Sequence, residues 1–188
     1  MKKILILLIL LSTVLFTGCN NTAISISDSK SYTQQNLEEG DSYISESNQT
    51  ILTTSNYYIG GITKNISLCM QQRQIIAQSD DTLDLVINLY EGGTFSGGTL
   101  IQNFNKERNY IDNSTFEIYK DVTVIDLGLK LPFESFVFGD KRIKTSTENF
   151  VSYIMKKNTT YILEIKNNGI KSADTIFVWN WFEYCSQS

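Results

Sequence analysis

The chain has 188 residues, 41% of them apolar and 12% aromatic, so it is long enough and apolar enough for one folded domain and is not a disordered protein. It contains no histidine, which excludes catalytic triads with an imidazole base and zinc sites with histidine ligands. The net charge is −4 at pH 7, opposite to the basic balance of nucleic-acid binding proteins, so no nucleic-acid partner is expected.

The first 18 residues have the composition of an export signal. Two lysines precede an interrupted apolar stretch, residues 4–16, that is too short to span a bilayer. The segment Leu15–Cys19 resembles the bacterial lipobox, in which the cysteine thiol is acylated and the leader is cut off, although Phe16 stands where an aliphatic residue is usual. We expect lipidation at Cys19, and therefore an exported chain held on a membrane. An ordinary secretory signal and an uncleaved anchor are the alternatives.

Residues 19–48 are rich in Asn, Ser, Thr, Gln and acidic residues, with apolar residues scattered singly. This composition predicts a flexible tether that holds a globular head, residues 49–188, away from the membrane surface. Export leads to an oxidising compartment, which allows a disulfide between Cys69 and Cys185. Two buried thiols are the alternative, and the spacing of the cysteines does not indicate a metal or redox site.

From residue 49 onward, apolar residues recur at every second position, which is the pattern of β-strands. The last such run, residues 174–183, is apolar on both faces, which is typical of a central strand, and we expect Trp179 and Trp181 to lie in the core. The other strong runs are 83–90 and 161–166. Weaker strand candidates are 51–59, 62–70, 73–78, 99–104, 114–125, 135–138 and 148–155.

Glycine pairs at 60–61, 92–93 and 97–98 separate these candidates and predict turns. The segments 92–98 and 126–148 are predicted to be long loops that can contact neighbouring molecules. Short strands at this spacing, without a helical pattern between them, predict an all-β fold: an antiparallel β-sandwich of the jelly-roll type.

Acidic residues are the main candidates for chemistry. Asp80, Asp81 and Asp84 could begin a calcium site, but a solvated turn is the simpler interpretation, and no metal or cofactor is expected. Glu91 and Glu183 each stand near the end of a strand and could act as an acid–base pair on a sugar. Nothing in the sequence brings these two carboxylates together, so no catalytic residue is predicted.

Short segments in the second half of the chain carry a resemblance to a known family. In order they are Val86–Thr94, Gly98-Thr99, Asn103–Arg108, Ile154–Leu163 and Trp179–Glu183. The series resembles small virion structural proteins of tailed bacteriophages and covers about residues 62–184. This resemblance implies a single jelly-roll or β-sandwich protein that serves as a head or tail component.

We therefore expect a non-enzymatic, lipid-anchored β-sandwich that works through contacts with other virion or cell-surface proteins, or with glycans, and that can form homo-oligomers. The alternative is a cell-surface lipoprotein that binds carbohydrate or blocks a phage receptor, because a virion component assembled in the cytoplasm has no use for a lipobox. The candidate contact residues are Tyr57, Tyr58, Phe95, Asn103, Asn105, Arg108 and Tyr110.

Overall fold

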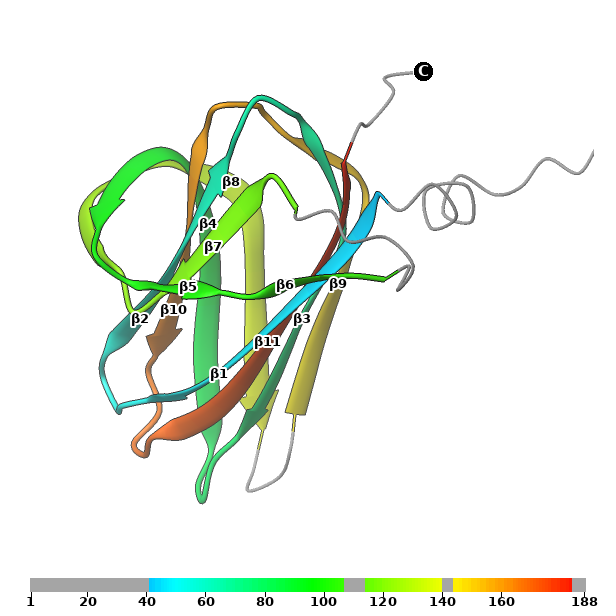
Figure 1. Cartoon of the computed structure of the whole chain (residues 1–188). Helices are drawn as coiled ribbons and strands as arrows, with labels where there is room; N and C mark the ends of the chain where they lie inside the picture. The colour runs from blue at the N-terminus through cyan, green and yellow to red at the C-terminus, as the bar shows by residue number, and fades with distance from the viewer. Residues whose placement is uncertain (1–40, 107–113, 140–143, 184–188) are drawn as a thin grey trace, which may run out of the picture. The chain divides into compact units, whose positions relative to one another are not determined.

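In the described part of the chain, eleven strands form two antiparallel sheets (Figure 1). The computed structural model describes residues 41–106, 114–139 and 144–183. Sheet A has the strand order β6 (Asn103–Asn105), β1 (Ser42–Ile51), β11 (Ala173–Glu183), β3 (Leu68–Gln78) and β9 (Lys144–Met155). Sheet B has the order β5 (Thr99–Ile101), β7 (Phe116–Lys120), β2 (Asn56–Thr63), β10 (Thr160–Asn167), β4 (Leu83–Ser96) and β8 (Thr123–Gly139).

The pairing of the strands is nested. β1 pairs with β11, β2 with β10, β3 with β9 and β4 with β8, so the early strands meet the late strands in reverse order, and successive pairs alternate between the sheets. This is the strand order of a jelly roll. Figure 1 shows β1 and the red β11 side by side although they lie at opposite ends of the described chain. The predicted antiparallel β-sandwich is thus confirmed. The remaining strands, β5 to β7, are inserted between β4 and β8 and extend the edges next to β1 and β2.

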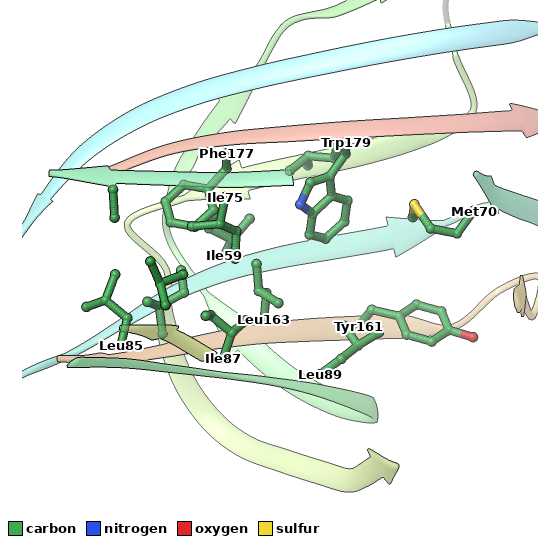
Figure 2. Packing of buried hydrophobic residues seen from close by; sticks show 14 of the residues in the cluster. Ile59, Met70, Ile75, Leu85, Ile87, Leu89, Tyr161, Leu163, Phe177 and Trp179 are labelled. Atoms are coloured by element: carbon green, nitrogen blue, oxygen red, sulfur yellow. The ribbon is translucent and has the colours of Figure 1, made fainter. Parts of the chain in front are cut away.

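The core lies between the two sheets. Figure 2 shows side chains of the two sheets that point toward one another: from sheet A Ile75, Phe177 and Trp179, and from sheet B Leu85, Ile87 and Leu163. Trp181 is fully buried, stacks on Tyr43 at 5.9 Å and meets the edge of Phe116 at 5.4 Å. Burial of such an aromatic side chain contributes about 4 to 6 kcal/mol, from about 150–250 Å² at about 25 cal/mol per Å². Both tryptophans therefore lie in the core, and β11 is an interior strand, as predicted.

The first strand begins earlier than predicted. β1 starts at Ser42, inside the segment assigned to the tether, and pairs with β11 along its whole length. Its inner face carries Tyr43, Ser45 and Ser47, all buried. The two small polar residues occupy positions where the pattern of a half-buried strand requires apolar ones, so the alternation is invisible in the sequence. The leader and residues 19–40 lie outside the described part of the chain.

The described parts of the two predicted long loops lie mostly in strands. β4 continues to Ser96, and β8 already begins at Thr123, so the segments 92–96 and 123–128 pair and lengthen the β4–β8 ladder; we call these two segments the β4–β8 extension. Ile125, Leu127, Leu129 and Leu131 do alternate with other residues there, so the sequence carries a strand pattern, although both faces of residues 123–132 are largely exposed. The turn predicted at Gly60-Gly61 is also wrong, since both glycines lie inside β2. The ring of Phe95 occupies the space that a side chain at Gly60 would fill, and the ring of Phe116 does the same at Gly61.

Candidate functional site

A polar cluster lies on the outer face of sheet B. On β10, Leu163 and Ile165 belong to the core, so Glu164 between them points to the opposite face. The strand register sets Glu164 beside Tyr58 of β2 and beside Asn88 of β4. We call Asn56, Tyr58, Asn88, Tyr90 and Glu164 the Glu164 cluster.

Glu164 is the acceptor at the centre of this cluster. Its Oε1 accepts hydrogen bonds from Asn56 Nδ2 at 3.1 Å and Tyr58 OH at 3.2 Å. Its Oε2 accepts from Asn88 Nδ2 at 3.0 Å and Tyr90 OH at 3.0 Å. The side chains around it leave Glu164 only 8% exposed. A buried carboxylate is tolerated when donors surround it, and here neutral amides and hydroxyls from the two neighbouring strands, β2 and β4, supply those donors.

The tyrosines of the cluster keep their protons at neutral pH. Burial, and then the hydrogen bond to Glu164, raise the pKa of Tyr90 to about 12. Burial also raises the pKa of Tyr58, partly opposed by the amide of Asn56. Both hydroxyls therefore donate inward to the carboxylate, and lone pairs of their oxygens remain as acceptors. The cluster is negatively charged and offers acceptors, which suits a partner that brings hydrogen-bond donors.

An exposed aromatic pair continues the same face on β8, the edge strand of sheet B. Asn88 pairs with Glu134, and Phe136 and Phe138 follow at every second position, so all three β8 side chains share the outer face. The two phenylalanine rings stack at 5.5 Å with an interplanar angle of 14° and are 47% and 56% exposed. We call the Glu164 cluster together with Phe136 and Phe138 the B face.

The β4–β8 extension bounds the B face on one side. It bends where Gly92 pairs with Gly128, both with a φ of +79°, and a side chain at Gly128 would collide with the backbone of Glu91 and Gly93. Past this bend, the ring of Phe95 lies over Gly60 of β2 and contacts Tyr119 with 5.8 Å between ring centroids. The β4–β8 extension thus lies over β2 and β10, and it covers Ile162, which is fully buried although it points outward.

The contact residues predicted from the sequence lie in different places. Tyr58 belongs to the B face, but Tyr57 points inward and stacks on Phe177 at 6.4 Å. Phe95 packs against Gly60 of β2 and Tyr119 of β7, Asn103 donates to the carbonyl of Phe116, and Asn105 pairs with Tyr43 through β6. Arg108 and Tyr110 lie outside the described residues. The structure therefore does not gather the described members of the set into one surface.

Glu91 and Glu183 have separate partners. Glu91 lies inside β4, not at its end as expected, and accepts from Lys156 Nζ at 2.6 Å and from Tyr161 OH at 3.0 Å. Glu183, on β11 of the other sheet, is 3% exposed. Its Oε1 accepts from Ser114 Oγ at 2.8 Å and from Thr115 N at 2.6 Å. Glu183 therefore fixes the segment that leads into β7, and neither carboxylate has the other among its hydrogen-bond partners.

The acidic residues Asp80, Asp81 and Asp84, considered above as the start of a calcium site, lie in and next to the turn before β4. Asp81 Oδ1 accepts from the backbone N–H of Thr82 at 2.7 Å, and Asp84 already lies in β4. No group of three or more Cys, Asp or Glu residues within the described ranges is placed to hold a metal ion. Those ranges also contain no helix that is long and apolar enough to cross a membrane.

Cys69 is disulfide-bonded. The other two cysteines of the chain, Cys19 and Cys185, both lie outside the described residues. The pairing of Cys69 with Cys185 and the lipidation of Cys19 therefore stay predictions.

Sequence reasoning missed most of the B face. Glu164 gave a weak signal, because it is a charged residue at an outward position of an otherwise apolar strand. Asn88 and Tyr90 likewise occupy outward positions of the strand that was predicted at 83–90. Their meeting with Glu164 depends on the register between β2, β10 and β4, which join distant parts of the chain.

No protein family matches the chain. No curated protein matches it either. Among solved structures, a chain from the structure of infectious bursal disease virus, Gx strain, is 11% identical with a TM-score of 0.14. The match covers 72% of this chain and 41% of that chain, so this chain spans less than half of its length. A similarity this low carries no argument, and function has to be argued from the surface itself.

Proposed function

We propose that the chain is a binding module without catalytic function that attaches to another protein through the B face. The observation that carries the proposal is the combination of two exposed, stacked phenylalanines with the Glu164 cluster on one sheet face. Exposed aromatic rings leave apolar area in water, and covering them with a partner is favourable. The neighbouring polar groups are already held in place, so they lose little freedom when a partner binds.

The chemistry of the B face describes its partner. Interfaces commonly consist of aromatic anchors surrounded by polar groups, and a few anchors carry most of the binding energy. Phe136 and Phe138 would be those anchors and would enter an apolar pocket of the partner. The tyrosine oxygens beside Glu164 would accept hydrogen bonds from basic or amide side chains of the same partner.

The resemblance to tailed-phage proteins suggests the identity of that partner. We infer that the chain has the role of a virion structural protein and that its partner is another virion protein. A cell-surface lipoprotein is the second candidate, and the lipobox-like segment Leu15–Cys19 favours it, because acylation of Cys19 would hold the chain on a membrane.

Cross-linking of the full chain in its producing cells tests this proposal. Phe136 is replaced by a photo-reactive benzophenone analogue of phenylalanine, and the matched control carries the same group at Ile170, an exposed apolar residue outside the B face. We expect one dominant cross-linked protein from position 136 and none from position 170. A partner found in purified particles supports the virion role, and a partner confined to cell membranes supports the surface role. Equal cross-linking from both positions would overturn the proposal.

A double substitution, Phe136→Ser with Phe138→Ser, separates binding from folding. Loss of two aromatic anchors is expected to weaken the association by at least about tenfold, or roughly 1.4 kcal/mol. Both side chains are about half exposed, so the melting temperature should change little. Unchanged association in a folded double variant would mean that another surface holds the partner.

A further inference from the structure

The outer face of sheet A has a hollow where β1, β11 and β3 lie side by side. Its volume is about 510 Å³. Pockets for small ligands measure about 300–1,000 Å³, so the hollow is large enough to hold one. It lies on the other sheet from the B face and shares no residue with it.

The strand register arranges the lining of the hollow in two cross-strand rows. In the first row, Asn48 of β1 stands beside Ile176 of β11, which stands beside Ile76 of β3. In the second row, Thr50, Asp174 and Gln78 follow in the same strand order. Two isoleucines thus form an apolar patch, with amide, hydroxyl and carboxylate groups around it.

The polar groups of the lining combine donors with acceptors. Thr50 Oγ1 donates to Asp174 Oδ1 at 2.6 Å, which holds the carboxylate in position. Asn48, Thr50, Gln78 and Asp174 are all exposed. Each amide side chain can donate and accept, and the carboxylate accepts only. The described lining includes one carboxylate and no cation, so an anionic ligand would be repelled.

We propose that this hollow binds a neutral saccharide. Sugar hydroxyls both donate and accept, and the amides of Asn48 and Gln78 together with the Asp174 carboxylate match that pattern. The C–H face of a sugar ring would lie on Ile76 and Ile176. This contact is favourable because it removes the apolar surfaces of both isoleucines from water. The hollow is open at the surface, so it accommodates one or two units of a longer glycan. This inference is independent of the protein contact through the B face.

Saturation-transfer NMR on the full chain tests the inference with defined probes. The neutral probes are maltotriose, cellotriose and tri-N-acetylchitotriose, and the anionic comparison is trigalacturonate. We expect transfer from the protein to at least one neutral probe and none to trigalacturonate. The combined change Asn48→Ala and Gln78→Ala should weaken that binding by about tenfold or more, because it removes two amides.

A matched control separates the hollow from the rest of the sheet. Gln74→Ala removes the same side chain from the same outer face of β3, outside the hollow, and should leave binding intact. The Phe136→Ser, Phe138→Ser variant should also keep binding, so failure of the proposed protein contact and failure of this inference remain distinguishable. The inference is overturned if no neutral probe receives saturation, or if binding persists in the double variant while circular dichroism shows it folded.

Discussion

The two sides of strand β10 have opposite roles in this molecule. Its inner side chains, Leu163 among them, are fully buried against sheet A, whereas Glu164 on the outer side is held by side chains of its own sheet. The inner layer depends on apolar area removed from water, and the B face depends on a few directed hydrogen bonds. Neighbouring residues of one strand can therefore be changed with separate consequences: a change on the inner side removes apolar packing between the sheets, and a change on the outer side removes hydrogen bonds of the B face.

The largest effect is expected from the inner side. Leu163→Ala should lower the free energy of unfolding by about 2 to 5 kcal/mol, because it leaves a cavity between the sheets. Lys166→Ala, an exposed outward position of the same strand, should change it by less than about 0.5 kcal/mol. Urea unfolding measures both. Similar losses in the two variants would remove the distinction between the sides of β10.

The β4–β8 extension beside the B face is expected to show the next largest effect. Gly128→Ala and Gly97→Ala both force a left-handed backbone conformation on alanine, at φ of +79° and +67°, which costs about 1 to 2 kcal/mol each. Only the side chain at position 128 would also meet backbone atoms, whereas the space around Gly97 is open. We expect Gly128→Ala to cost about 1 to 3 kcal/mol more than Gly97→Ala in thermal unfolding. Equal losses would mean that the bend is not tightly packed.

The centre of the B face is expected to show an intermediate effect. Glu164→Gln replaces one acceptor oxygen with an NH₂ group, which would then face the N–H and O–H donors of the cluster. The substitution should lower the free energy of unfolding by about 1 to 3 kcal/mol. Glu134→Gln is the matched control, because Glu134 is 41% exposed and pairs with Lys130 at the surface. That exposed ion pair should contribute at most about 1 kcal/mol. A larger loss at Glu134 in chemical denaturation would contradict the assigned roles.

The smallest effect at neutral pH is expected at Tyr90. Tyr90→Phe removes one of the hydrogen bonds to Glu164, worth about 1 kcal/mol. The pKa of Tyr90 is raised to about 12, above the usual value of about 10, so its contribution is complete below about pH 10 and is lost as pH rises toward 12.

Two alkaline measurements check this assignment. Above pH 10, the stability of the Tyr90→Phe variant should fall less steeply with pH than that of the parent chain. The difference in tyrosinate absorbance between the two proteins should have its titration midpoint near pH 12. A midpoint near pH 10 would mean that Tyr90 is neither buried nor bonded to a carboxylate.

Alternation in the sequence was sufficient to predict the fold class, because Leu83–Leu89 and the last strand follow it closely. It failed for β1, whose inner face carries Ser45 and Ser47, and it was not decisive for residues 123–132, where Ile125, Leu127, Leu129 and Leu131 alternate although both faces are largely exposed. In each case a strand is defined by its pairing and not by its own pattern of burial.

The Glu164 cluster could not be predicted for a related reason. Glu164 is 106 residues from Tyr58 and 76 residues from Asn88 in the chain. The three side chains meet only because their strands pair in one register. The turn predicted at Gly60 and Gly61 is wrong for a similar reason. These residues are small because the rings of Phe95 and Phe116 pack against them, and not because the chain turns there. Such contacts between distant segments leave no local signal.

Hydroxyl-radical footprinting of the full chain, free and in its assembled state, tests the central claim most directly. Phe136 and Phe138 on the B face are compared with Leu52 and Ile170, which are exposed apolar residues outside it. We predict that assembly lowers the oxidation rates of the two phenylalanines severalfold and leaves those of Leu52 and Ile170 unchanged. Protection confined to Leu52 and Ile170, or no protection at the phenylalanines, would contradict the claim that the B face is the contact surface.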